Sequence, residues 1–245
     1  MPYITIFRLM KKLIIYWICT TCVLLCSCSH PTPALRIDLP SDWTEAWLLH
    51  QRTLDSLPKT LRIDTLSPKQ QQLVWNGPVN DTLEFILIPI SSPIQHVSER
   101  IPHKIHLYLL PGETTRLAVK GRPEQFGYEV LEGSNLNYGV CDFINLYAPT
   151  LQQEFELNNQ LFDLIKQQNL KVKIDTLVAP LQAISRYNQN LVTDYFKSHT
   201  REAVCGHVWL ELPKSKAIAM ETLLPHGVRN GILKQRIDQQ LSCER

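Results

Sequence analysis

The chain has 245 residues, 44 % of them hydrophobic and 20 % charged, which is the composition of a globular protein of one or two domains. Nine glycines and 16 prolines exclude collagen-like chains and glycine-rich linkers. Residues 1–27 carry three basic and no acidic side chains, so the rest holds 22 basic and 23 acidic groups, a net charge of −1. A near-neutral chain without a basic stripe is not typical of nucleic-acid binding, and we expect no nucleic-acid partner.

The amino terminus has the pattern of a signal peptide. Residues 1–12 hold the three positive charges, and residues 13–25 form a continuous apolar run. A helix of 13 residues rises about 20 Å, which is short of the roughly 30 Å hydrocarbon core of a bilayer. This pattern favours a removable signal over a membrane-spanning anchor.

The residues that follow the apolar run resemble a bacterial lipobox. Leu25-Cys26-Ser27-Cys28 places an aliphatic residue at −3, a small one at −1 and a cysteine at +1. The resemblance implies a signal peptide over residues 1–27, with Cys28 acylated by diacylglycerol and fatty acids such as palmitate. Acyl chains on Cys28 would anchor the protein in membrane lipid, because each buried methylene contributes about 0.8 kcal/mol. The alternative is a plain secretory signal in which Cys26 and Cys28 have no role.

After Cys28 the sequence predicts a tether and then a β domain. Residues 28–40 contain three prolines and are expected to be an extended, lipidated tether. Residues 41–133 show short runs with period-two alternation, and Thr82–Ile88 is apolar enough to be buried on both faces. The turn Pro111-Gly112-Glu113 predicts a hairpin between its flanking runs. The predicted strands are Lys59–Leu66, Gln71–Trp75, Thr82–Ile88, Ile105–Leu110, Thr114–Lys120 and Gln125–Leu131.

From residue 134 to residue 245 the pattern becomes helical. Ser134 is a plausible N-cap, and apolar residues then recur at spacings of three and four. The predicted helices are Leu136–Tyr147, Thr150–Gln168, a third containing Leu177–Tyr195, Arg201–Leu212, Lys216–Leu224 and Val228–Leu241. The fold class predicted is α+β: an antiparallel β-sandwich or curled sheet followed by an all-helical bundle.

The seven cysteines do not form a recognisable redox site. Cys19 and Cys22 have C-x-x-C spacing but lie inside the apolar signal, with nothing to lower a thiol pKa. Cys141 and Cys205 lie in apolar helical stretches, where a cysteine packs like a small hydrophobe. Cys243 is predicted to be an exposed free thiol. A disulfide between two of these last three cysteines remains an alternative that the spacing does not decide.

The histidines do not suggest a metal site. His103 and His106 are three apart, so on a strand their imidazoles point to opposite faces, and we expect both at an exposed edge. His207 lies two residues after Cys205, a spacing at which helical side chains do not face each other and the thiol is not activated. The prediction from these patterns is no metal and no cofactor.

No motif for catalysis occurs in the sequence. G-x-S-x-G, G-x-G-x-x-G and the Walker phosphate loop are all missing. Four aromatic residues of the β half, Trp43, Trp47, Trp75 and Tyr108, could line a binding groove, although core packing explains them as well. We therefore expect a protein that is not an enzyme.

The order of these elements resembles one family. The lipobox, the turn Leu110-Pro111-Gly112-Glu113, the junction Val130–Asn135, Tyr195–His199 and a terminal helix Gly231–Leu241 occur together in it. They resemble the amino-terminal accessory region of Bacteroides-type envelope lipoproteins that end in a thioredoxin-like thiol-disulfide oxidoreductase domain. The resemblance covers about residues 40–241 and implies no catalytic residues.

The resemblance also sets an expectation about activity. In such relatives a thioredoxin-like domain with a Trp-Cys-x-x-Cys site follows the terminal helix, whereas this sequence ends at Arg245. We expect either a stand-alone accessory module or a truncated gene, without thiol-disulfide activity of its own.

The sequence thus predicts a lipid-anchored, periplasm-facing envelope lipoprotein that acts as a non-enzymatic binding or scaffolding module. Its partners would be membrane lipid, through Cys28, and a thioredoxin-like or other envelope protein. The alternative is a redox-linked accessory protein of a thioredoxin-like system that works through a free cysteine, Cys243 or Cys205, or through a separate partner.

Overall fold

The computed structural model describes residues 33–54, 62–90, 102–123, 125–166 and 172–242. The predictions for the signal peptide, Cys28 and Cys243 lie outside these residues. Residues Pro33–Arg245 form one compact unit, to which the following description is confined.

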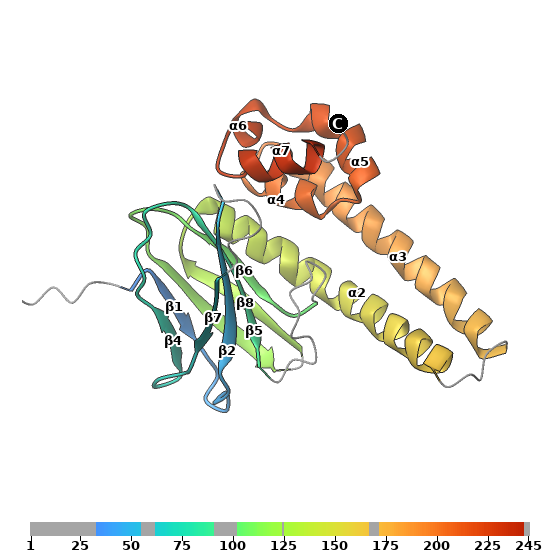
Figure 1. The fold of residues 1–245 in the computed structure, drawn as a ribbon, viewed down its shortest axis with the longest axis horizontal. Helices are drawn as coiled ribbons and strands as arrows, with labels where there is room; N and C mark the ends of the chain where they lie inside the picture. The colour runs from blue at the N-terminus through green and yellow to red at the C-terminus, as the bar shows by residue number, and fades with distance from the viewer. Residues whose placement is uncertain (1–32, 55–61, 91–101, 124, 167–171, 243–245) are drawn as a thin grey trace, which may run out of the picture. The chain divides into compact units, whose positions relative to one another are not determined.

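Eight strands form two four-stranded sheets (Figure 1). The first sheet has the order β4-β1-β7-β8 and the second has the order β3-β2-β5-β6. All strand pairs are antiparallel except β1 and β7, which run parallel. The strands are β1 Leu35–Asp38, β2 Trp47–Thr53, β3 Arg62–Leu66, β4 Gln72–Trp75, β5 Leu83–Pro89, β6 Ile105–Leu109, β7 Thr115–Arg122 and β8 Gln125–Glu132.

In the described chain the strands are followed by helices, which confirms the predicted α+β class. The long helices α2 and α3 pack along each other, and the short carboxy-terminal helices pack around α4 (Figure 1). The helices are α2 Asn135–Lys166, α3 Val172–Ser198, α4 Val204–Glu211, α5 Lys214–Ala219, the 3-10 turn η1 Glu221–Leu223, α6 His226–Arg229 and α7 Lys234–Ser242.

The predicted tether ends earlier than expected. Leu35–Asp38 form β1, which lies between β4 and β7, and the side chains of Leu35 and Ile37 are fully buried. The prolines of residues 28–40 suggested an extended tether, and an extended chain is also what a strand requires. The sheet therefore begins at residue 35 rather than at residue 41.

The turn at Pro111-Gly112 is confirmed, but the hairpin is wrong. The N–H of Glu113 donates to the carbonyl of Leu110 at 3.1 Å, and Gly112 has φ +78°, as a type II turn requires at that position. However, β6 belongs to one sheet and β7 to the other. The turn carries the chain across from one sheet to the other because β6 pairs with β5 and β7 pairs with β1 and β8.

The break predicted between Tyr147 and Thr150 does not occur. Helix α2 runs through Pro149, although a proline inside a helix typically costs about 3 kcal/mol. Ala148 and Leu151 on either side are buried. The amide of Asn188 on α3 donates to the carbonyl of Thr150 at 3.3 Å, so contacts with the neighbouring helix hold the chain helical across the proline.

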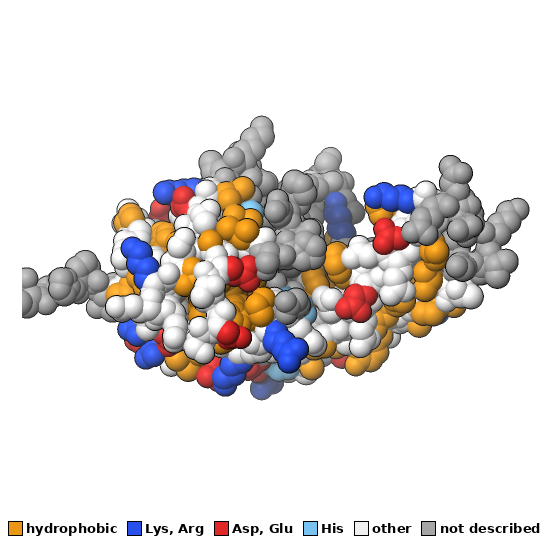
Figure 2. Space-filling model, turned by 90° about the horizontal axis from the view of Figure 1, so that it is seen from below, with side chains coloured by type: hydrophobic (Ala, Val, Ile, Leu, Met, Phe, Trp, Pro, Cys, Tyr) orange, Lys and Arg blue, Asp and Glu red, His pale blue; other side chains and the backbone are white. Residues whose placement is uncertain are grey.

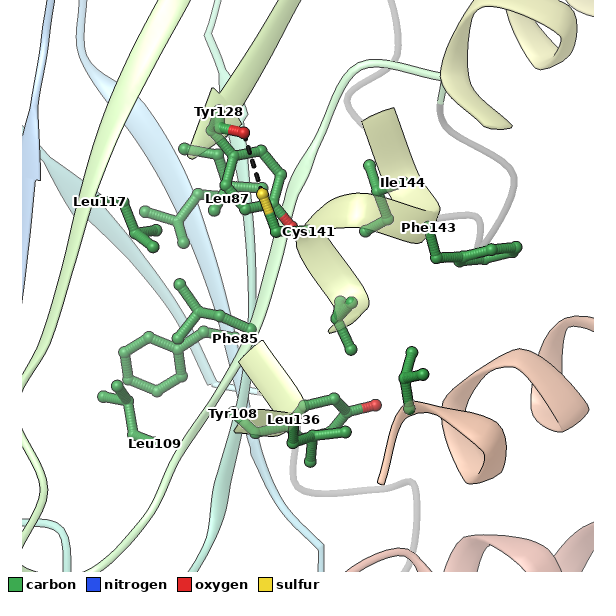
Figure 3. Close-up of a cluster of buried hydrophobic side chains, with 14 of the residues drawn as sticks. Phe85, Leu87, Tyr108, Leu109, Leu117, Tyr128, Leu136, Cys141, Phe143 and Ile144 are labelled. Atoms are coloured by element: carbon green, nitrogen blue, oxygen red, sulfur yellow. Dashed lines mark hydrogen bonds between the residues drawn. The ribbon is translucent and has the colours of Figure 1, made fainter. Parts of the chain in front are cut away.

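One hydrophobic core joins the two sheets and α2 (Figure 3). Phe85 and Leu87 of β5 face Leu117 of β7, and Cys141 and Ile144 of α2 lie beside them. Every residue of β5 is buried, as the sequence predicts for this strand. Its odd-numbered side chains enter this core, and the even-numbered ones point to the opposite face of the sheet.

Helix α2 closes the open side of the two sheets by capping their edge strands. The amide of Asn137 bonds the backbone N–H and C=O of Tyr108 in β6, both at 2.8 Å. Two turns later, Asn145 bonds the same groups of Tyr128 in β8, at 3.3 and 2.7 Å. The helix starts where the sequence predicts, since the N–H of Asn137 donates to the Ser134 hydroxyl at 3.3 Å.

Candidate functional site

A buried glutamate lies at the centre of the candidate site. Glu84 of β5 has no exposed surface, and its carboxylate accepts hydrogen bonds from three other elements. These donors are Arg52 of β2, His106 Nε2 of β6 at 2.7 Å, and Arg236 Nη1 of α7 at 2.7 and 2.9 Å. A buried carboxylate is stable only when such partners replace water.

The partners decide the charge of Glu84. Burial by itself would raise the pKa of this carboxyl, but hydrogen bonds from His106 and Arg52, with the charge of Arg236, hold the pKa well below its usual value. Glu84 is therefore ionised at neutral pH and can only accept hydrogen bonds. The ring of His106 must then donate Nε2–H, and its other nitrogen, Nδ1, carries a lone pair.

A second histidine packs against His106 from the helical side. The rings of His106 and His207 on α4 meet edge to face, with centroids 4.6 Å apart. His207 Nδ1 shares a hydrogen bond with the Tyr108 hydroxyl at 3.0 Å. Within the described residues, neither His106 Nδ1 nor His207 Nε2 has a hydrogen-bond partner, although both atoms are buried.

Both imidazoles are neutral in the folded protein. Burial lowers the pKa of His106 to about 4, against the opposing effect of Glu84. Burial and the nearby His106 and Lys104 lower the pKa of His207 well below its usual value. Each ring thus offers one unprotonated nitrogen, which is the form that can bind a metal ion.

Glu211 completes the cluster at the end of α4. It lies four residues after His207, and residues at that spacing share one face of a helix. Its Oε1 is 3.9 Å from Nζ of Lys104, which is itself buried. One ligand atom from each of His106, His207 and Glu211 lies within 4.8 Å of the others. A small cavity of about 10 Å³, the size of one water, adjoins Lys104 and Glu211.

The expectation of two edge-exposed histidines is wrong for His106 and only half right for His103. His106 is buried, because α4 and α7 cover the face of β6 that the sequence pattern leaves open to solvent. His103 is half-buried, and its Nδ1 bonds the carbonyl of Phe126 in β8 at 3.1 Å. His103 lies before β6 and not on it, so the alternation of side chains along a strand does not set the direction of its imidazole.

The two cysteines in the described residues have the properties of core residues. Cys141 and Cys205 are both buried and unpaired, so they do not form a disulfide with each other. Burial raises the pKa of Cys141 to about 11 and that of Cys205 to about 12, which suppresses the nucleophilic thiolate. His207 shares its hydrogen bond with Tyr108 and does not activate Cys205.

The aromatic residues considered for a groove mostly belong to the core. Trp43 and Trp47 are buried and stack with ring centroids 5.6 Å apart, and Tyr108 is fully buried. Trp75 is partly buried and packs edge-on against Phe85. Core packing is thus the role of Trp43, Trp47 and Tyr108.

A surface pocket is lined by β8, by the neighbouring part of β7 and by α2. Its volume is about 480 Å³, and it is lined by Lys120 of β7, by β8 between Gln125 and Glu129, by His103 and by Asn145, Ala148 and Pro149 of α2. Lys120 Nζ and Glu129 Oε2 form an exposed ion pair of 2.5 Å at its rim. We call this the β8 pocket.

Sequence reasoning missed Glu84, Arg236, Lys104 and Glu211. A lone glutamate in an otherwise apolar strand was the available signal for Glu84, because a charge that is buried on both faces requires partners. The His-x-x-x-Glu spacing of His207 and Glu211 was a second signal. The contacts of Arg236 with Glu84 join residues 152 apart in the chain and have no local pattern.

No family model, curated protein or solved structure matches this chain. Among the described helices, none combines the length and the apolar character needed to cross a membrane.

Proposed function

We propose that this protein is a lipid-anchored, periplasm-facing envelope lipoprotein whose folded part is a non-enzymatic binding or scaffolding module. The proposed localisation in the envelope rests on the basic n-region, the apolar run over residues 13–25 and the lipobox that ends at Cys28. The proposed relationship to accessory regions of Bacteroides-type thioredoxin-like lipoproteins rests on the motifs quoted above. A module of this kind needs a surface that holds a partner.

The β8 pocket is the observation that supports a binding role. Its volume of about 480 Å³ falls in the range of roughly 300–1,000 Å³ found for ligand sites. Its walls come from a strand pair and a helix that share one core, so the pocket is preformed on rigid elements. Its lining combines apolar side chains, among them the buried Phe126 and the exposed Pro149, with the polar side chains of Lys120, Glu129 and Asn145.

This lining fits a segment of another envelope protein. An ion pair of both signs at the rim suits a partner that carries mixed charge, whereas a pocket for a small anion or cation would carry one sign. On the face shown in Figure 2, basic and acidic side chains are likewise interspersed. The redox alternative rests on Cys243, because Cys141 and Cys205 are buried and have raised pKa values.

Site-specific photo-cross-linking in the native envelope tests the pocket. A photoreactive residue is placed at Lys120 or at Gln125, both exposed at the pocket. The control position is Ile63 in β3, which is 57 % exposed and is not part of the pocket. We expect the same cross-linked protein at Lys120 and Gln125 and none at Ile63. Products that are identical at all three positions, or absent at all three, would contradict a binding role for the pocket.

Intact-mass measurement of protein purified from native membranes tests the anchor separately. The expected mature chain starts at Cys28 and carries acyl chains, and Cys28→Ala should abolish both cleavage and lipid attachment. A lipid-free chain that starts elsewhere would refute the lipoprotein assignment. Mixed-disulfide trapping of wild-type and Cys243→Ser proteins tests the redox alternative, which requires a trapped partner only in the wild type.

A further inference from the structure

We infer that His106, His207 and Glu211 form a binding site for one divalent transition-metal ion with the ligand preferences of zinc. We call this the His–His–Glu site. The inference goes beyond the proposed binding role and does not depend on it. It also departs from the sequence-based expectation of no metal, which considered only His103 with His106.

The donor set is that of a three-ligand zinc site. Two imidazole nitrogens and one carboxylate oxygen are ligands that Zn²⁺ takes readily, commonly with a fourth position left for water. One such atom from each of the three residues lies within 4.8 Å of the other two. Tetrahedral bonds of about 2.0–2.2 Å separate ligand atoms by roughly 3.5 Å, so small side-chain rotations suffice to close the site.

Rigid elements and outer-shell hydrogen bonds hold the two histidines. His106 donates Nε2–H to Glu84, and Glu84 is fixed in turn by Arg52 and Arg236. His207 uses Nδ1 to bond the Tyr108 hydroxyl at 3.0 Å. Metal-binding histidines almost always bond their second ring nitrogen to a carboxylate or another polar group, which orients the ring and sets its tautomer. Both histidines have that arrangement here.

The nitrogens that remain are the ones a metal would use. His106 Nδ1 and His207 Nε2 are buried and have no partner within the described residues. An unsatisfied buried polar atom is unfavourable, and natural structures hold few of them. The two rings that carry these atoms have centroids 4.6 Å apart, and one ring nitrogen of each lies within 4.8 Å of the other and of the Glu211 carboxylate. A single cation bound at this point would give the histidines the partner that they lack. This observation distinguishes the cluster from a self-contained ion-pair network.

Lys104 is the competing cation. Its ammonium lies 3.9 Å from the Glu211 carboxylate, so a metal ion must share Glu211 with Lys104 or displace it. The charge of Glu84 is already balanced by Arg52 and Arg236, so Glu211 is the carboxylate of the cluster that the ion would share with the residue's present partners. Lys104→Met should therefore tighten metal binding, because it removes a cation that competes for Glu211 and repels the ion.

Zinc titration of the full chain tests the site, with Zn²⁺ alone as the probe. All samples carry serine in place of Cys19, Cys22, Cys26, Cys28 and Cys243, so that none of these thiols binds the ion, and are stripped with a chelator before titration against a chromophoric zinc indicator. We expect one high-affinity ion per wild-type chain. His207→Ala and Glu211→Gln should each weaken binding by about 100-fold or more, and Tyr108→Phe by about 10-fold.

His50→Gln is the matched control for the loss of a buried histidine. His50 lies on the same face of the sheet, across β5 from His106, and is 3 % exposed. Among the residues that the structure describes, neither of its ring nitrogens has a hydrogen-bond partner. This variant should bind zinc as the wild type does. Circular dichroism checks that each variant is folded. Glu211→Gln, whose side chain is partly exposed, serves if His207→Ala does not fold.

Cobalt replacement gives a readout that is independent of affinity. Co²⁺ in a site with few ligands and low symmetry absorbs strongly in the visible range, and we expect this spectrum in wild type and His50→Gln but not in His207→Ala. The inference is overturned if the wild type binds no zinc tightly. It is also overturned if His207→Ala and Glu211→Gln keep the wild-type affinity and spectrum, since the ion would then bind elsewhere.

Discussion

The side-chain amide of Asn137 pairs with the backbone of Tyr108 as a neighbouring strand would. Its Nδ2 donates to the Tyr108 carbonyl and its Oδ1 accepts from the Tyr108 N–H, each at 2.8 Å. Asn145 repeats the arrangement at Tyr128 on the other sheet. Because β6 and β8 are edge strands, these amides satisfy backbone groups that would otherwise be buried without partners under α2.

Replacing Asn137 should therefore destabilise the fold well beyond the loss of one contact. In Asn137→Ala both backbone groups of the buried Tyr108 lose their partner, at about 1–3 kcal/mol each. We expect the free energy of unfolding to fall by about 2–4 kcal/mol, measured by denaturant unfolding. Asn159→Ala, at an exposed position on the same helix, should change it by less than about 0.5 kcal/mol. Equal effects at both positions would mean that the amide pairing does not matter.

Two strand glutamates with cationic partners should differ strongly in their contribution to stability. Glu84→Gln removes a fully buried charge and leaves Arg52 and Arg236 uncompensated, so we expect a loss of about 3–5 kcal/mol. Glu129→Gln breaks the exposed pair with Lys120 and should cost less than about 1 kcal/mol. Thermal and denaturant unfolding of both variants measures the difference. A loss of less than about 1 kcal/mol in Glu84→Gln would contradict this expectation, since it would mean that the guanidinium groups of Arg52 and Arg236 reach water when the carboxylate is removed.

The stability of the fold should decrease in mild acid, partly through His50. Burial lowers the pKa of His50 below its usual value of 6.5. As the pH falls below that value, the unfolded chain binds the proton first, so the contribution of neutral His50 to stability is present at higher pH and is lost in acid. His50→Gln does not titrate, and its stability relative to wild type should therefore rise between about pH 8 and about pH 5. A constant difference over that range would rule out this linkage.

Thiol reagents should not reach Cys141 or Cys205 in the native protein. Both thiols are buried, and their pKa values of about 11 and about 12 leave almost no thiolate near pH 8. We expect mass spectrometry to show both cysteines unmodified until denaturant is added, when both react. Rapid labelling of native Cys205 would instead revive the redox alternative for that residue.

Several local features followed from the sequence because their causes are local. The type II turn at Pro111-Gly112 requires only a proline and a residue that tolerates positive φ. The N-cap at Ser134 likewise depends only on its own hydroxyl and the first turn of the helix that follows. Six of the strands followed from alternation. Burial of β5 on both faces followed from the apolar character of every residue in it except Glu84.

Pairing partners could not be predicted in the same way. The β6–β7 hairpin was wrong because a tight turn fixes the direction of the chain and leaves open which strand each arm will join. The predicted break at Pro149 was wrong because contacts with α3 outweigh the local penalty of the proline. In both cases a long-range contact overrode a local preference.

The amino-acid sequence alone determined the α+β order, the position of the capped helix start and the burial of β5, because periodicity and turn chemistry act within a few residues. Only the tertiary structure brought Glu84, His106, His207 and Glu211 together, since they come from two strands and a helix more than 100 residues further along the chain. Local patterns do not encode such contacts. Helices α4 and α7 pack over one face of the sheet and bury Glu84 and the two histidines, and Glu84 there accepts hydrogen bonds from His106 and Arg236.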